Sequence, residues 1–101
     1  MGEISIFEKT GRYAENKDIA RELRVKEILP ALDKGEDVVL NFNEVEVATQ
    51  SFIHALISDA IRQHEKEALD RLAFKSCNES IQRIISIVVD YMQEALKEKK
   101  K

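Results

Sequence analysis

The chain has 101 residues, of which 44% are hydrophobic, 35% charged and 6% aromatic, and its formal net charge is −3. This length provides for one domain with one core, and no apolar run approaches the roughly 20 residues of a membrane span. The single cysteine, three glycines and one proline exclude an internal disulfide, a cysteine-based zinc site and a glycine-rich phosphate loop.

The start of the chain is typical of a strand. Residues 3–8 alternate apolar and polar side chains apart from Phe7, which predicts a half-exposed strand, and residues 10–13 predict a turn. The first residues also lack the basic and long apolar regions of a secretory signal. Together with the lone cysteine, this predicts a cytoplasmic protein.

The next segment predicts a helix with an interruption. Asn16 is a suitable N-cap for a helix that begins near Lys17 and ends at Gly35. The apolar residues and Pro30 predict a kink or break over residues 24–30, and the alternative is a straight helix covered on two sides. The apolar residues fall on two nearly opposite faces, with Ile19 and Leu23 on one and Val25, Ile28, Leu29 and Leu32 on the other.

Two further strands are predicted. Residues 36–42 contain a nearly continuous apolar run from Val38 to Phe42, which is typical of a central strand covered on both faces in a parallel sheet. Residues 72–75 form a shorter apolar stretch, which predicts the third strand of the sheet.

Two further helices are predicted. One begins near residues 49–51, runs to about Glu65 and has a broad apolar face. The other is capped by Asn78, and its apolar stripe is widened by Ile87 and Tyr91. The stripe recurs at three- and four-residue spacing at Ile81, Ile84, Ile85, Val88, Val89, Met92 and Leu96.

The order of these elements is strand, helix, strand, helix, strand, helix. This alternation predicts a single α/β domain over residues 1–96, with a largely parallel or mixed sheet and packed helices, followed by a basic tail at residues 97–101. Removing the four lysines and one glutamate of the tail from the chain's 16 basic and 19 acidic residues leaves a net charge of −6. Because such a body repels phosphates, we expect no nucleic-acid binding, and the tail is typical of a solvated helix end. We also expect no membrane partner, since no apolar run is long enough to span a membrane.

Residues 38–53 resemble the core of STAS domains, which include the bacterial anti-sigma factor antagonists. In that family a hydrophobic strand ends in an acidic residue, and a loop with a valine leads to Asp-Ser-Ser-Gly at the start of a helix. Asn41 stands where the strand aspartate often stands, and Val45 matches the loop valine. Thr49-Gln50-Ser51-Phe52 stands in place of the four motif residues.

The likeness is closer to a branch of STAS-like domains of unknown function, and it covers about residues 3–90. The motifs of that branch correspond here to Gly11-Arg12-Tyr13-Ala14, Leu40-Asn41-Phe42, Thr49-Gln50-Ser51-Phe52 and Phe74-Lys75-Ser76-Cys77-Asn78. The resemblance implies a STAS-like fold.

The resemblance also implies a binding module without enzymatic activity. STAS antagonists bind an anti-sigma factor that is a histidine-kinase-like ATPase, and this partner phosphorylates the second serine of the motif and thereby breaks the complex. Ser51 occupies that position, whereas Thr49 and Phe52 depart from the usual Asp and Gly. The regulatory or partner-binding candidates are Ser51, Thr49, Gln50, Phe52, Asn41 and Arg12.

Each of these candidates also has a structural interpretation. Thr49 and Ser51 are ordinary N-cap residues, and one of them is expected to satisfy backbone N–H groups at the helix start. Asn41 suits a hydrogen-bonded turn at the end of a strand. Arg12 suits either an ion pair with a carboxylate or contact with an anionic ligand.

Catalytic and metal-binding patterns are weak, so we expect no enzymatic activity, no cofactor and no bound metal. A free cysteine such as Cys77 is usually a small buried hydrophobic residue. Ser51 and His54 are three residues apart on the predicted helix, but such a pair alone is no triad. His54 and His64 would lie about 15 Å apart along one helix, which is too far to share a metal, and His64 is expected on the solvated surface.

Three functions remain open. The first is a STAS-like protein-interaction module whose partner surface lies around residues 49–54. The second is a structural or oligomerising subunit, such as a homodimer, that uses the apolar face of the helix over residues 78–96. The third is a small-ligand site, for instance for a nucleotide, at the carboxyl ends of the strands near Arg12, Asn41 and Ser51.

Overall fold

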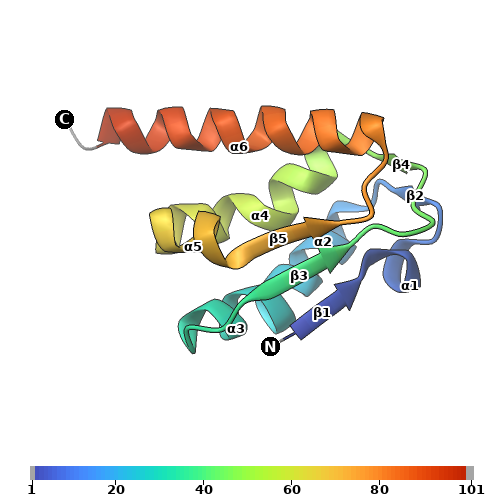
Figure 1. Cartoon of the computed structure of the whole chain (residues 1–101), viewed down its shortest axis with the longest axis horizontal. Helices are drawn as coiled ribbons and strands as arrows, with labels where there is room; N and C mark the ends of the chain where they lie inside the picture. The colour runs from blue at the N-terminus through green and yellow to red at the C-terminus, as the bar shows by residue number, and fades with distance from the viewer. Residues whose placement is uncertain (1, 100–101) are drawn as a thin grey trace.

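A parallel sheet of three strands forms the centre of the molecule. The computed structural model describes residues 2–99, and its main sheet contains β1 (Gly2–Ser5), β3 (Val38–Asn41) and β5 (Leu72–Lys75) (Figure 1). Their order is β1-β3-β5, and both neighbouring pairs are parallel. The predicted α/β class, the central position of the apolar run and the strand at 72–75 are therefore confirmed.

The sheet is covered more fully on one face than on the other. Ile4, Leu40 and Leu72 are buried, while Glu3 and Ala73 on the alternate positions are exposed. Burial likewise alternates between buried and half-buried along β3. The prediction that β3 is covered on both faces therefore holds in full for one face only, because the residues of β3 on the other face are half-buried.

The first strand ends earlier than residues 3–8 predict. Ser5 caps a short helix, α1 (Ile6–Thr10), by accepting a hydrogen bond from Glu8 N at 3.3 Å. Ile6 is fully buried in this helix. The predicted turn follows at Gly11, whose φ of 73° lies in the left-handed region that favours glycine.

A second, very short parallel pair was not predicted. Tyr13 of β2 (Tyr13–Ala14) pairs with Val47 of β4 (Val47–Ala48). The pairing extends through a hydrogen bond from Thr49 N to the Ala14 carbonyl at 3.1 Å. Because helices begin two or three residues after each strand, this pair brings the starts of two helices together.

The predicted interruption of the first long helix is confirmed. The chain passes from α2 (Lys17–Leu23) through a π-helical turn, η1 (Arg24–Ile28), into α3 (Leu29–Asp33). Leu29 N bonds to the Arg24 carbonyl, five residues back, which widens the helix here. The wider turn allows Leu23 and Ile28, which a straight helix would place on different faces, both to be buried.

The remaining helices follow the predictions with one addition. The predicted starts are confirmed for α4 (Gln50–His64), which is capped by Thr49, and for α6 (Glu79–Lys99), where Asn78 Oδ1 accepts from Ile81 N at 2.9 Å. The connection between α4 and β5 contains a helix that was not predicted, α5 (Lys66–Arg71), which buries Ala68. α6 includes the beginning of the basic tail, and residues 100 and 101 lie outside the described residues.

The core lies between the sheet and the helices, and α4 is central to it. α4 packs against α2 on one side and α6 on the other, and α6 runs along one side of the molecule past β5 (Figure 1). Arg24 ties the π-helical turn to α4, since its Nη1 donates to the Ala55 carbonyl at 3.1 Å and lies 3.3 Å from Asp59 Oδ2. The largest fully buried side chains include Ile6, Ile28, Leu40, Phe42, Phe52, Leu56 and Ile81.

Candidate functional site

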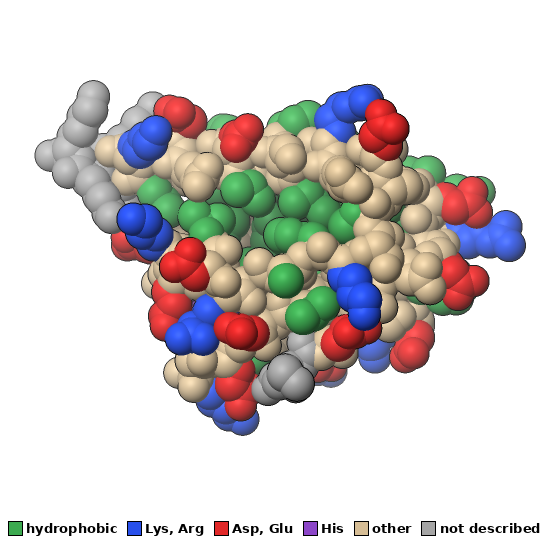
Figure 2. Space-filling model, viewed as in Figure 1, with side chains coloured by type: hydrophobic (Ala, Val, Ile, Leu, Met, Phe, Trp, Pro, Cys, Tyr) green, Lys and Arg blue, Asp and Glu red, His purple; other side chains and the backbone are tan. Residues whose placement is uncertain are grey.

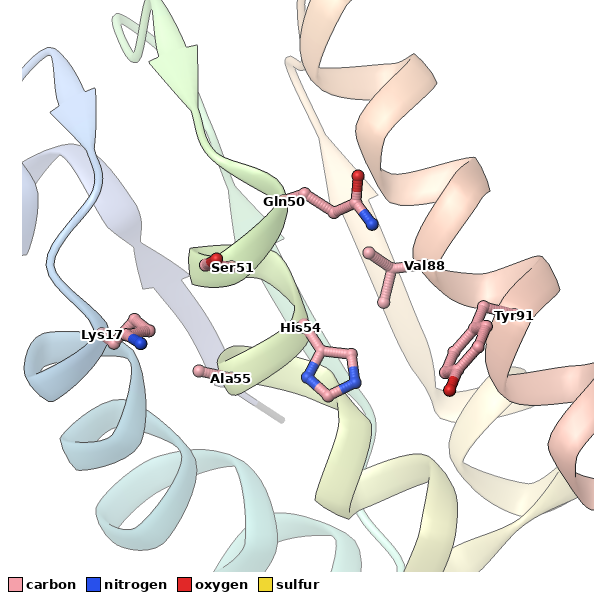
Figure 3. Close-up of a pocket in the computed structure, with 7 residues that line it drawn as sticks. All are labelled: Lys17, Gln50, Ser51, His54, Ala55, Val88 and Tyr91. Carbon is pink, nitrogen blue, oxygen red and sulfur yellow. The ribbon is translucent and has the colours of Figure 1, made fainter.

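A groove of about 610 Å³ lies beside the first turns of α4. Its walls come from the start of α2, the first half of α4 and the middle of α6 (Figure 3). The short pairing of β2 with β4 fixes the starts of α2 and α4 side by side, and the packing of α6 against α4 closes the other wall. The described lining residues are Lys17, Gln50, Ser51, His54, Ala55, Val88 and Tyr91.

The first turn of α4 divides its roles among three neighbouring side chains. Thr49 Oγ1 accepts a hydrogen bond from Phe52 N at 3.1 Å, so Thr49 is the N-cap. Phe52 is fully buried and packs in the core. Ser51 is exposed, and within residues 2–99 its hydroxyl makes no hydrogen bond.

An aromatic pair forms the wall on the α6 side. The His54 and Tyr91 ring centroids lie 6.3 Å apart with the ring planes inclined by 55°. Figure 3 shows His54 extending from α4 toward α6, with Tyr91 opposite it. Tyr91 is 64% exposed, which is unusual for an aromatic side chain at the centre of a long helix.

Lys17 is the charged side chain at the opposite wall of the groove. It is exposed at the first position of α2, and Figure 3 shows it on the α2 side of Ser51 and Ala55. Its ammonium makes no ion pair within the described part of the chain. None of the described residues that line the groove carries a carboxylate.

The family is identified by a segment that includes α4, whereas the groove residues Lys17, Val88 and Tyr91 lie outside that segment. A family model described as a STAS-like domain of unknown function (DUF4325) matches residues 20–82, which is more than half of the chain. The chain belongs to this STAS-like family. The comparison with curated proteins and the comparison with solved structures each gave no match.

The family match confirms the resemblance carried by the motifs around Asn41 and Thr49–Phe52. In this STAS-like domain Thr49, Gln50 and Ser51 lie together at the start of α4, and Gln50 and Ser51 line the groove. The segment Phe74–Asn78 also lies within the matched residues, at the end of β5 and the start of α6. The Gly11–Ala14 motif precedes the matched residues.

Asn41 is engaged in hydrogen bonds away from the groove. Its Nδ2 donates to Glu3 Oε2 at 2.8 Å, and its Oδ1 accepts from Asn43 N at 2.8 Å, so it orders the turn after β3. The hydrogen bond from Asn41, with the nearby Lys75 ammonium, lowers the pKa of the Glu3 carboxyl below its usual value. The Asn41 amide thus already donates one hydrogen bond and accepts another within the domain.

Arg12 is likewise paired inside the domain. Its Nε lies 3.5 Å from Glu46 Oε2, and its carbonyl accepts hydrogen bonds from Glu46 N and Val47 N. The ion pair is exposed, with more than half of each side chain accessible. The structure therefore separates Arg12 and Asn41 from Ser51, and only the last lines the groove.

Cys77 lies at a second groove, of about 490 Å³, between the end of β5 and α6. Its lining includes Phe74 and Ile85, and Figure 2 shows hydrophobic side chains gathered between α6 and the strands. Burial raises the pKa of the Cys77 thiol, which keeps it protonated and poorly nucleophilic near neutral pH.

The sequence predicts His64 on the solvated surface, whereas in the structure its side chain is largely buried. Its side chain is 16% exposed, and its Nε2 lies 2.9 Å from Asp33 Oδ1, which ties the end of α4 to the end of α3. No cluster of three or more potential metal ligands occurs among the described residues. No described helix is both long and apolar enough to cross a membrane.

Sequence reasoning missed Lys17 and gave Tyr91 only a general role as part of a wide apolar stripe. Lys17 had one signal, because a lysine at the first position of a helix opposes the helix dipole. For Tyr91 the sequence gave no signal beyond its position in the apolar stripe, since its pairing with His54 depends on how α6 packs against α4.

Proposed function

We propose that this STAS-like domain is a cytoplasmic protein-interaction module without enzymatic activity, and that it binds its partner at the groove with Ser51 as the switch position. One observation carries the proposal. Thr49 caps α4, so the Ser51 hydroxyl is exposed beside the groove without a capping role. Of the two interpretations of Ser51, this geometry favours regulation.

A phosphate on Ser51 would change the groove strongly. It adds a charge of about −1.5 to −2 and three acceptor oxygens. The first turn of a helix tolerates such a group because its N–H groups and dipole favour anions. At a protein interface the same group opposes binding, since it must be desolvated and repels carboxylates of the partner.

Exposed apolar side chains near the groove support a protein partner. Ile87 and Tyr91, one turn apart on α6, are 44% and 64% exposed. Tyr13 and Val47, paired across β2 and β4 just before α2 and α4 begin, are also exposed. Clustered exposed apolar and aromatic residues are typical of interaction surfaces.

The resemblance to anti-sigma factor antagonists suggests the class of partner, a histidine-kinase-like ATPase or an anti-sigma factor. A homodimer through the apolar stripe of α6 has less support. Most of that stripe, including Ile81, Ile85, Val88 and Met92, is buried within the domain.

Affinity capture from a lysate of the native host, with mass spectrometry as the readout, tests the proposal. We expect the wild type and Ser51→Ala to retain an ATPase or anti-sigma factor, and Ser51→Asp to retain clearly less of it, as a tenfold rise in Kd from a loss of about 1.4 kcal/mol in binding would cause. Ser80→Asp is the matched control, since Ser80 is exposed at the same position, the second residue, of α6. Equal retention by Ser51→Asp and the control would refute a switch at Ser51.

A further inference from the structure

The groove beside Ser51 has a charge opposite to that of the chain. The chain carries a net charge of −3, yet the formally charged side chain among the described lining residues is Lys17. Two other lysines are paired with carboxylates of the domain, Lys26 at 3.8 Å from Glu22 and Lys75 at 3.5 Å from Glu3. The groove thus presents a cation to whatever enters it.

Local helix stability does not account for Lys17. It occupies the first position of α2, where the helix dipole disfavours a cation. The acidic residue of that turn, Asp18, lies within 4.0 Å of Arg21 instead. A contact outside the domain would give this side chain a stabilising role.

The wall of the groove opposite Lys17 is formed by aromatic and aliphatic side chains, which together make an apolar ledge. His54 and Tyr91 form an aromatic pair, and Val88 and Ala55 complete the floor. Ile87 extends the ledge along α6, with 44% of its side chain exposed. One surface therefore combines a cation with aromatic and aliphatic groups.

We propose that the groove binds an acidic amphipathic helix of a partner protein, with a carboxylate at Lys17 and apolar side chains against Tyr91 and Ile87. A helix fits because α2, α4 and α6 form the walls, so side chains rather than a free strand edge are offered for pairing. The inference rests on the proposed function and names the chemistry of its partner.

A second copy of the chain is a poorer occupant. A two-fold axis through the groove would place one groove against the other, so that two surfaces whose described lining carries no carboxylate would meet. A head-to-tail contact would instead continue into a ring or an open chain of copies. The carboxylates come from a different protein, and a phosphate on Ser51 competes with them for Lys17.

The test uses a phage-displayed library of random 20-residue peptides, selected on the wild-type chain. We expect recovered peptides to carry Asp or Glu among apolar residues at helical spacing, and to bind more weakly as salt is raised. By fluorescence anisotropy, Lys17→Glu and Tyr91→Ala should each raise the Kd of such a peptide about tenfold or more.

Lys66→Glu is the matched control, since Lys66 is exposed at the first position of α5 and undergoes the same change of charge. We expect it to change the Kd less than about twofold. Lys17→Glu should remain folded, because a carboxylate at a helix start is favourable. The inference is wrong if no peptide is recovered, if the peptides lack acidic residues, or if Lys17→Glu and Lys66→Glu bind equally.

Ser51→Asp, measured on the same peptide, distinguishes this inference from the proposed function. If Ser51→Asp releases the peptide and Lys17→Glu does not, the switch stands and the acidic-helix inference fails. If Lys17→Glu releases it and Ser51→Asp does not, the docking site stands and the switch fails. Self-association that Lys17→Glu abolishes would make the occupant a second copy and overturn the choice of partner.

Discussion

Two sets of polar residues that the family motifs bring to notice behave in opposite ways. Asn41 and Arg12 are held by Glu3 and Glu46 in hydrogen bonds or ion pairs of the domain itself. At the start of α4, by contrast, Ser51 projects into solvent with no hydrogen bond to its hydroxyl among the described residues.

The difference teaches how to separate supporting from functional polar residues in a small domain. A side chain whose donors and acceptors are satisfied internally contributes to local order, whereas an exposed one beside a groove is free to meet a partner. The same criterion separates Lys75, which lies 3.5 Å from Glu3, from Lys17 at the groove.

The largest effect is expected from a substitution that disrupts the core packing next to Ser51. Phe52 is fully buried next to it, so Phe52→Ala should lower the free energy of unfolding by about 3–5 kcal/mol. Urea denaturation followed by circular dichroism measures this. A loss below about 1 kcal/mol would mean that Phe52 does not anchor the start of α4.

A smaller effect separates the cap from the switch. Thr49→Ala removes the acceptor for Phe52 N and should cost about 1 kcal/mol. Ser51→Ala should change stability by less than about 0.5 kcal/mol, since its hydroxyl supports no contact in the described fold. Equal losses for the two variants in urea denaturation would place part of the cap on Ser51.

The smallest effect sharpens the role of Asn41. The pKa of Glu3 is lowered first by the hydrogen bond from Asn41 and then by the charge of Lys75. Asn41→Ala should therefore raise this pKa toward its usual value of 4.5, because it removes the largest single contribution, and Lys75→Met should raise it as well. Titration of the Glu3 carboxyl by NMR measures both shifts.

The sign of the pH dependence follows from the lowered pKa. In the wild type, Glu3 stabilises the fold at neutral pH, and the contribution is lost as the pH falls through the lowered folded-state pKa. In Asn41→Ala this acid-dependent contribution should shrink. An unchanged Glu3 titration would show that the hydrogen bond does not hold in solution.

Strong local patterns made much of the fold predictable. The apolar run in β3, the caps Asn16 and Asn78, and the two-faced pattern that becomes η1 all led to correct elements. α1 was missed although Ser5 and Glu8 have the spacing of a capping box, because the alternation before it continued into a strand prediction. The strands β2 and β4 are too short to produce a periodic pattern of apolar residues in the sequence.

The groove was harder to predict because it depends on packing between distant segments. The motif led to Ser51, but Lys17 and Tyr91 reach the same groove only through the pairing of β2 with β4 and the packing of α6 on α4. Neither contact leaves a trace in the spacing of residues along the chain.

The π-helical turn also takes up one extra residue between α2 and α3. Its hydrogen bonds span five residues instead of four, so η1 holds one residue more than the α-turn that it replaces. Deleting one residue there, such as the exposed Val25, would therefore restore an ordinary α-turn and leave Lys17 facing the groove. A deletion within α2 has no such turn to absorb it, and would rotate the residues before it by about 100° relative to those after it. A relative of this domain can thus lose one residue in Arg24–Ile28 and still offer its partner the same side chains.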